Sequence, residues 1–403
     1  MWHMLAVMRR NLQNTSKSPR VADENMFVDE AQVFNVKKYG AKANSDISKA
    51  LLSAWKDACA SKSRSQVVVP GGTYKLNEVL FEGPCKAPVD MKVQGTLQAN
   101  GDHSAFKTDG WVTFQHIDGF SLSGGGTFDG QGAHAWSKVN CHEKRNCGRP
   151  PINIRFNYVS NAEVHDITSL NSKNFHINLL GCKSFNIQHI SIVTPENSPN
   201  TDGIHIGRSN GIKILDTSIK TGDDCISMGD GTHEVDIEKV TCGPGHGISV
   251  GSLGKYPNEQ PVSGIRVKNC TLRNTMNGVR IKTWPSSPGQ STASDMHFDN
   301  ILMDNVGNPI LIDQEYCPWG QCKLQVPSKV KISNVSFKNI RGTSTTHDAV
   351  KLVCSKSLPC ENVEIGTIDL KYHGPEGAAK TTCLNIRPKF SGQQNPVTCS
   401  KKS

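Results

Sequence analysis

An apolar pattern of eight residues recurs along this chain from about residue 160, and it limits the folds that the chain can adopt. Each copy places apolar residues at its first, third, sixth and eighth positions, as in Phe185, Ile187, Ile190 and Ile192. A weaker copy around Val164 comes first, and later copies begin at Ile212, Val235, Ile265, Met296, Val330 and Val363. Two short strands with alternating side chains, joined by a bend, satisfy this pattern.

The spacing of the copies indicates a solenoid. Their third positions recur at intervals of 27, 23, 30, 31, 34 and 33 residues. Repeats of about 20–50 residues with β character are typical of solenoids and propellers, but a propeller blade needs about 40–45 residues. A further strand precedes each copy, as at Ile204, Ile226 and Ile248. We therefore predict an all-β parallel β-helix, which agrees with an aromatic content of only 6% and with 36 glycines.

Residues Asp46 to Cys59 carry the one clear helical pattern, which Ser45 or Asp46 can cap. The apolar face of this helix consists of Ile47, Ala50, Leu51, Ala54, Trp55 and Ala58. A solenoid exposes its core at its ends, so we expect the helix to cover the N-terminal end. We predict one domain over residues 31–399, a disordered or processed segment 1–30 and a loose tail 400–403.

The 14 cysteines predict an oxidising compartment. The short loops Cys317–Cys322 and Cys354–Cys360, together with the pair Cys383 and Cys399, are typical of disulfides. Zinc is not expected, because no paired cysteine motif with further ligands is present. The apolar run Met1–Met8 is short, and Arg9-Arg10 follows it, so a secretory signal is not evident. We nevertheless expect a secreted protein.

The formal charge of +9 suggests a polyanionic partner, which could be nucleic acid, anionic lipid or an acidic polysaccharide. Lysines and arginines are scattered along the chain, and no nucleic-acid recognition motif accompanies them. No apolar run is long enough for a transmembrane helix. Neither nucleic acid nor a membrane is therefore the expected partner, and an acidic polysaccharide stays open.

Polar residues follow the predicted coils in the middle of the chain. Asp202, Asp224 and His246 are each 22 residues apart. If one coil has this length, they stack at about 4.8 Å per coil. Asp223 can join them only at a bend, which Gly222 can supply. Clustered carboxylates should hold at least one proton to higher pH, which glycosidic cleavage by an acid and a base requires.

Other interpretations of these residues stay open at this point. An Asp-Asp pair after glycine is more often a turn or a helix cap. Clustered aspartates also bind calcium, but the Asp-x-Asp-x-Asp-Gly loop is missing. Arg280 and Lys282 flank Ile281 and point to one face of a strand, where such charges are commonly solvated edge residues. Their shared register with the aspartates favours a site.

At these residues the chain resembles glycoside hydrolase family 28, the polygalacturonases. The resemblance runs from about Phe34 to Cys399, and the sequence is most similar to those of pollen exopolygalacturonases of plants. It rests on Asn200-Thr201-Asp202, Gly222-Asp223-Asp224, Gly245-His246-Gly247, Arg280-Ile281-Lys282 and Ile312-Asp313-Gln314-Glu315-Tyr316-Cys317.

The resemblance implies a right-handed parallel β-helix and inverting hydrolysis of α-1,4-linked galacturonic acid in pectin, without a cofactor or metal. By matching position, Asp223 would be the general acid, and Asp202 and Asp224 would activate water. His246 would tune this cluster by hydrogen bonding. The substrate-binding residues would be Asn200, Arg280, Lys282 and Tyr316. In an inverting enzyme the acid and the base stand about 6.5–9.5 Å apart.

Two other functions on the same scaffold remain possible from the residues. A pectate lyase would need calcium and a base, and it would form unsaturated products. A catalytically impaired β-helix would bind cell-wall polyanion without turnover, but none of the three aspartates is lost. The choice between exo and endo action depends on loops at the end of the site, for which residues 253–261 are a candidate; exo action is the expectation.

Overall fold

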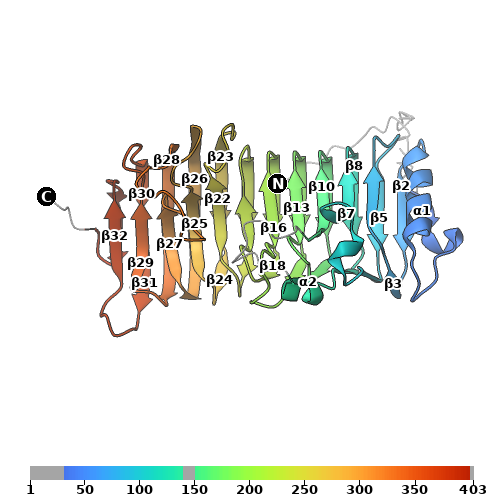
Figure 1. Ribbon diagram of the computed structural model, residues 1–403, viewed down its shortest axis with the longest axis horizontal. Helices are drawn as coiled ribbons and strands as arrows, with labels where there is room; N and C mark the ends of the chain where they lie inside the picture. Colours follow the sequence, from blue (N-terminus) through green and yellow to red (C-terminus); the bar gives the residue numbers. More distant parts are fainter. Residues whose placement is uncertain (1–30, 139–149, 400–403) are drawn as a thin grey trace, which may run out of the picture. The chain divides into compact units, whose positions relative to one another are not determined.

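The computed structural model describes residues 31–138 and 150–399, which form a parallel β-helix (Figure 1). One sheet has eleven strands in the described residues, and this sheet carries the polar cluster. Its strands are β4 (Val79–Glu82), β7 (Gly110–Gln115), β10 (Ile152–Asn157), β13 (Ile177–Leu180), β16 (Ile204–Gly207), β19 (Ile226–Met228), β22 (Ile248–Leu253), β25 (Asn277–Thr283), β27 (Asn308–Asp313), β29 (Asp348–Val353) and β32 (Lys380–Leu384).

The remaining strands pair in a second group of parallel ladders. They are β1 (Gln32–Asn35), β2 (Ser65–Val69), β3 (Thr73–Lys75), β5 (Val89–Val93), β6 (Thr96–Gln98), β8 (Asp118–Ser123), β9 (Thr127–Asp129), β11 (Ser160–His165), β12 (Thr168–Leu170), β14 (Lys183–Gln188), β15 (Ser191–Val193), β17 (Asn210–Leu215), β18 (Ser218–Lys220), β20 (His233–Glu238), β21 (Thr241–Cys242), β23 (Val262–Lys268), β24 (Thr271–Arg273), β26 (Ser291–Val306), β28 (Val330–Ser344), β30 (Glu361–Ile365), β31 (Ile368–Tyr372), β33 (Lys389–Phe390) and β34 (Gln394–Asn395). The helical segments are η1 (Val36–Tyr39), α1 (Ser48–Ala60), η2 (His103–Ala105) and α2 (Ala133–Lys138).

Each central coil contains three strands, as the apolar pattern predicts. In one coil β13 leads into β14 and β15, and in the next β16 leads into β17 and β18. Residues at the same position of the pattern pair across coils, so that Ile187 lies beside Ile214 and Ile214 beside Ile237. All three are buried. The parallel β-helix and the spacing of its central coils are therefore confirmed.

One copy of the pattern is assigned wrongly from the sequence. The copy that begins at Val330 is displaced by five residues, because Met296 pairs with Val335 and Phe298 with Phe337. The reason is that β26 and β28 are long strands, whose first residues also alternate between buried and exposed positions. An apolar alternation that extends past the usual start of a strand leaves its register ambiguous in the sequence.

A residue with left-handed backbone conformation forms the bend between the two halves of five of the described copies. Its φ angle lies between 46° and 56° at His189, Asp216, Lys239, Asn269 and Asn300. Asparagine and aspartate tolerate this conformation better than other side chains do, because their short polar groups bond locally. The repeated bend turns the chain by the same amount in successive coils and keeps their strands in register.

Helix α1 covers the first coils, as expected (Figure 1). Its predicted apolar face is buried, and the ring of Trp55 lies 5.2 Å from that of Phe81. The helix begins at Ser48, two residues after the predicted start, and ends at Ala60. Asp46 accepts a hydrogen bond from the Ser48 N–H at 3.0 Å, so it satisfies one free donor of the first turn from just outside the helix.

The three predicted disulfides are confirmed, and within residues 31–138 and 150–399 two more link Cys59 to Cys85 and Cys225 to Cys242. Cys182 and Cys270 are buried free thiols. The segments predicted as 1–30 and 400–403 lie outside the described residues, so these domain boundaries stay a prediction. Within the described part of the chain, no helix is long and apolar enough to cross a membrane.

Candidate active site

Asp202, Asp224 and His246 occupy the same position in three successive coils. Each stands two residues before the first residue of a strand, in β16, β19 and β22. These strands pair in register, so Ile204 lies beside Ile226 and Ile226 beside Ile248. The 22-residue spacing therefore corresponds to one coil, and the predicted stacking of the three side chains is confirmed.

Close backbone approach explains the glycines around these residues. A Cβ atom on Gly222 would lie 2.1 Å from the carbonyl oxygen of Ser198, and one on Gly247 would lie 2.2 Å from that of Asn277. Gly247 also has a φ angle of 91°, which L side chains rarely adopt. Only glycine fits at either position. The bend at Gly222 brings Asp223 to the same edge of the sheet as Asp224.

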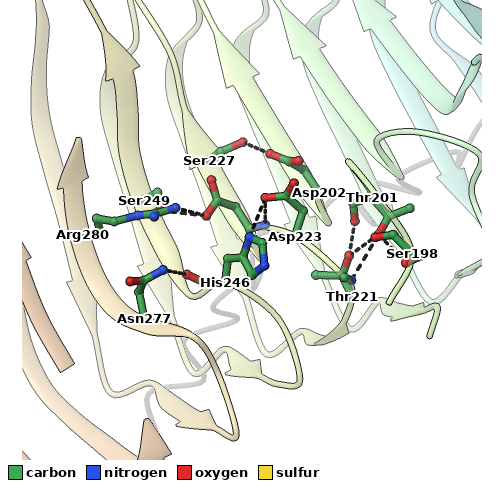
Figure 2. A network of polar contacts seen from close by, with 12 residues as sticks. Ser198, Thr201, Asp202, Thr221, Asp223, Ser227, His246, Ser249, Asn277 and Arg280 are labelled. Carbon is green, nitrogen blue, oxygen red and sulfur yellow. Dashed lines mark hydrogen bonds and ion pairs between the residues drawn. The ribbon is translucent and has the colours of Figure 1, made fainter. Parts of the chain in front are cut away.

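A buried group of hydroxyls supports the turns that carry Asp202 and Asp223 (Figure 2). The Thr201 hydroxyl lies 2.7 Å from that of Ser198 and 3.0 Å from that of Thr221, and it accepts the N–H of Gly222 at 3.1 Å. These bonds join two adjacent coils through residues that lie next to Asp202 and Asp223 in the chain. They fix the spacing of the carboxylates before any substrate binds.

Asp223 and His246 form a hydrogen-bonded pair (Figure 2). The Asp223 Oδ1 atom lies 3.0 Å from His246 Nδ1, and it also accepts the N–H of Asp224 at 2.8 Å. The backbone N–H of His246 also donates to the backbone carbonyl of Asp223 at 2.7 Å. Both side chains are partly exposed, so this pair forms the accessible side of the cluster.

Asp224 is enclosed by cations. Its Oδ1 atom accepts from Arg280 Nη2 at 2.8 Å and from Ser249 Oγ at 2.9 Å, and its Oδ2 atom accepts from Lys282 Nζ at 2.6 Å. Burial opposes ionisation of this carboxyl, but Lys282 and Arg280 outweigh it and lower the pKa of Asp224 to about 2. Asp224 is therefore an anion throughout the physiological range.

Asp202 has the opposite electrostatic environment. It is only 7% exposed, and burial and the neighbouring Asp223 and Asp224 raise its pKa well above the usual range for aspartate. The Ser227 hydroxyl opposes this shift by donating to Asp202 Oδ2 at 2.7 Å. His205 Nδ1 lies 2.8 Å from the same hydroxyl. Of the clustered carboxyls, Asp202 is therefore the one whose environment favours keeping a proton to higher pH.

This geometry can perform acid–base chemistry on a substrate that reaches Asp223. The partly exposed Asp223 lies next to the buried anion Asp224 and near Asp202, whose pKa is raised. Arg280 and Lys282 bind the carboxylate of Asp224. Such an arrangement separates the protonation states of neighbouring carboxyls, as hydrolysis of a glycosidic bond requires.

Comparison with known proteins identifies the family. The model of the Glycosyl hydrolases family 28 matches residues 59–399. The chain belongs to this family.

Two plant relatives and one solved structure illustrate the similarity of this family 28 hydrolase to known proteins. The "Polygalacturonase" of Gossypium hirsutum is 54% identical over 367 residues, covering 91% of this chain and 90% of that protein. The "Exopolygalacturonase" of Platanus acerifolia is 53% identical over 366 residues, covering 91% and 97%. The crystal structure of endo-xylogalacturonan hydrolase from Aspergillus tubingensis matches with a TM-score of 0.76 at 25% identity, covering 89% of this chain and all of that one.

The predicted binding residues of the family 28 hydrolase differ in how close they lie to the aspartates. Arg280 and Lys282 contact Asp224 directly, so part of their hydrogen-bonding capacity is used within the protein. The Tyr316 ring lies 5.1 Å from Lys282 Nζ and 5.7 Å from the Arg280 guanidinium carbon. Asn200 is exposed, has a φ of 53° and makes no side-chain hydrogen bond to the aspartates in the described structure.

Sequence reasoning missed Ser227 and Ser249, which bind Asp202 and Asp224. A signal for them exists in the sequence, since each is the polar residue between two apolar ones in the strand that follows Asp224 or His246. The two serines pair in register, and Arg280 occupies the next position of the same ladder. The three residues therefore form one row of side chains, whose polar groups hydrogen-bond to Asp202 and Asp224.

The same cluster includes a group of residues that could hold a metal. The ligand atoms of Asp223, Asp224 and His246 lie within 4.8 Å of one another. Both oxygens of Asp224 already accept hydrogen bonds from cations, however, so a metal ion there would face two positive charges at contact distance. Asp224 is therefore better suited to pairing with Arg280 and Lys282 than to binding a divalent metal ion.

The spacing of Asp223 and Asp224 bears on stereochemistry. One oxygen of each lies within 4.8 Å of the other, whereas the about 6.5–9.5 Å typical of an inverting enzyme separates the carboxyl groups of the acid and the base. The predicted inversion therefore stays a prediction.

Proposed function

We propose that this family 28 hydrolase cleaves α-1,4-D-galacturonosidic linkages in pectin and homogalacturonan. We also propose that it is exo-acting, so that it cleaves from the end of the polysaccharide chain. The observation that carries this proposal is the cluster of Asp202, Asp223 and Asp224 beside the buried cations Arg280 and Lys282. Carboxylates supply the acid and the base of glycosidic hydrolysis. Positive charges suit a substrate with a carboxylate on each sugar.

Asp223 is the general acid in this proposal. It is the most exposed of the three carboxyls, so it is the one that can reach the oxygen of the leaving group. His246 hydrogen-bonds to Asp223 and thereby orients the acid.

Asp202 and Asp224 activate water as a pair. Asp224 is a weak base because its cations lower its pKa to about 2, whereas the raised pKa of Asp202 makes that carboxylate the stronger base once it is ionised. Asp224 orients the water and Asp202 accepts its proton.

Arg280 and Lys282 connect the catalytic anion to the substrate. The hydrogen bonds that they make within the protein use Arg280 Nε and Nη2 and one Lys282 contact. A guanidinium has five N–H donors and an ammonium has three, so donors remain for a galacturonate carboxylate. Tyr316 covers both cations and supplies an adjacent apolar face. Asn200 contributes at the outer edge of the site, on the turn before Asp202.

Product analysis of purified protein on polygalacturonate tests the proposal. Exo action releases galacturonate monomer from the first minutes of the reaction, while the viscosity of the polymer falls slowly. A ladder of oligomers with a rapid loss of viscosity would instead mean endo action. Absence of any new reducing ends would contradict hydrolysis and would support a binding protein. Proton NMR of the first anomer formed decides between inversion and retention.

A calcium-dependent lyase is the second candidate, because Asp223, Asp224 and His246 could hold a cation. A lyase would form products that absorb in the ultraviolet and would lose its activity in a chelator. We expect neither effect, since the cations at Asp224 already neutralise the charge that a metal would balance.

We also propose that the protein is secreted and acts as a monomer. Disulfides such as Cys59–Cys85 and Cys225–Cys242 support an oxidising compartment. Light scattering of the purified protein tests the monomer, and fractionation of the producing tissue tests the location in the cell wall.

A further inference from the structure

A second group of aromatic and cationic side chains lies next to Tyr316. Lys255 Nζ lies 5.2 Å from the ring centroid of Trp319, 5.3 Å from that of Trp284 and 5.7 Å from that of Tyr256. The Trp284 ring is 5.3 Å from both Trp319 and Tyr316. We call Lys255, Tyr256, Trp284 and Trp319 the Lys255 platform. Tyr316 connects it to Arg280 and Lys282.

The platform is built on the strands that carry the candidate active site. Its residues follow β22, β25 and β27, which are neighbours in the eleven-stranded sheet (Figure 1). Backbone hydrogen bonds continue past the strand ends, from the Trp284 N–H to the Leu253 carbonyl at 2.8 Å and from the Tyr316 N–H to the Thr283 carbonyl at 3.2 Å. A substrate bound at Arg280 and Lys282 can therefore extend onto the platform along the same strands.

Two local devices hold the platform rigid before a ligand binds. The Glu259 carboxylate accepts three consecutive backbone N–H groups, from Gly254, Lys255 and Tyr256, at 2.5, 2.9 and 2.9 Å. The disulfide between Cys317 and Cys322 closes the short loop that presents Trp319. Binding to a preorganised surface loses less conformational entropy than binding to a flexible loop.

The platform presents groups whose polar capacity is not satisfied within the described structure. Lys255 is exposed, and its ammonium makes no ion pair with a carboxylate of the described residues. The Trp284 Nε1 atom is buried and has no hydrogen-bond partner there. Trp319 and Tyr256 are 42% and 57% exposed. Large exposed aromatic rings around an unpaired cation are typical of a binding surface.

We propose that the Lys255 platform is an additional subsite for a uronate residue of the substrate, beyond the one that Arg280, Lys282 and Tyr316 contact. The Lys255 ammonium binds the carboxylate of that sugar, and the exposed ring of Trp319 packs against the apolar face of the sugar ring. This inference rests on the proposed function and adds to it that longer oligogalacturonates bind through one more sugar than short ones do. It also assigns a role to residues 253–261.

Kinetics on oligogalacturonates of different length test the subsite. Digalacturonate is too short to occupy both the catalytic subsites and the platform, whereas longer oligomers reach it. We expect Lys255→Ala to lower kcat/KM about ten-fold on the long oligomers, as for the loss of one charged hydrogen bond, and to change it less than two-fold on digalacturonate. Lys255→Arg should keep most of the activity on both.

Lys213→Ala is the matched control, because it removes one positive charge from an exposed position on β17. It separates local recognition from general attraction of a polyanion to the basic protein. Equal losses for Lys255→Ala and Lys213→Ala on the long oligomers would overturn the subsite, and so would equal losses for Lys255→Ala on long and short substrates. The melting temperatures of both variants should match that of the wild type.

Methyl esterification distinguishes the two contacts of the platform. On methyl-esterified oligomers that the wild type still hydrolyses, the Lys255→Ala effect should disappear, while Trp319→Ala should still lower kcat/KM. An undiminished Lys255→Ala effect on such substrates would contradict carboxylate recognition. If the wild type hydrolyses neither digalacturonate nor longer oligomers, the proposed function fails. If it hydrolyses both and Lys255→Ala behaves like the wild type, only the subsite fails.

Discussion

At the scale of single residues, two aspartates of the same cluster have opposite electrostatic environments. Asp224 accepts bonds from two buried cations, which lower its pKa, whereas Asp202 is buried beside two other carboxyls, which raise its pKa. Each of them accepts a hydrogen bond from a serine hydroxyl: Asp202 from Ser227, and Asp224 from Ser249. The contrast follows from which neighbours the coil places beside each carboxyl.

Amide substitutions of these two aspartates should therefore differ in stability although both abolish activity. Asp224→Asn leaves Arg280 and Lys282 buried without their anion, and we expect it to lower the free energy of unfolding by about 3–5 kcal/mol. Asp202→Asn removes a buried carboxyl without stranding a cation, so the change should stay within about 1 kcal/mol or be stabilising. Urea denaturation of the two variants measures the difference, and equal destabilisation would contradict these environments.

Ser227→Ala should shift the pH dependence of activity. The Ser227 hydroxyl donates to Asp202 and thereby favours its ionised form, which lowers the pKa of this carboxyl. Loss of that bond raises the pKa, so a higher pH is needed to ionise Asp202 as the base. We expect the acidic limb of the kcat/KM profile to move to higher pH, with wild-type folding. An unchanged limb would mean that another group controls it.

At the scale of elements, the turns before β16, β19 and β22 depend on positions where no side chain fits. The sequence indicates the turns through their glycines, but it does not say which turn residue lies against a neighbouring coil. Gly222 lies against the Ser198 carbonyl, while Gly71 has no atom within 4 Å of its Cβ position. Only the packed structure separates these two glycines.

Gly222→Ala should consequently be costly and Gly71→Ala should be harmless. The added Cβ of the first would lie 2.1 Å from a backbone oxygen, so the turn that carries Asp223 must move. We expect a loss of about 1–3 kcal/mol in the free energy of unfolding and a fall of about 100-fold in kcat/KM. Wild-type kinetics for Gly222→Ala would show that the turn does not position the acid.

The elements also show why part of the register could not be predicted. Copies of the pattern around Ile187, Ile214 and Ile237 were assigned correctly because each strand ends at a polar bend. Strands β26 and β28 continue through the expected boundary, so an alternating sequence offered two starting points five residues apart. Likewise, a 22-residue spacing predicts that side chains stack, but it does not predict that Arg280 and Lys282 bind Asp224.

At the scale of the whole molecule, the chain combines a polyanion-attracting charge of +9 with a local site for acid and base. The charge alone leaves nucleic acid, anionic lipid and polysaccharide as possible partners, and membership of the Glycosyl hydrolases family 28 favours a polysaccharide. The family and the fold could be predicted from ordered motifs along the chain. The Lys255 platform could not, because its residues come from three separate loops that only the coil brings together.

The central claim is that the stacked carboxylates hydrolyse galacturonan with Asp223 as the acid. The most direct measurement is the turnover of polygalacturonate by purified Asp223→Asn beside the wild type, with melting temperatures recorded for both. We expect kcat to fall by about 100-fold to 10,000-fold while the melting temperature is retained, because the amide keeps the shape of the side chain and cannot donate the proton of an acid. Near-normal turnover by a folded Asp223→Asn protein would contradict the account.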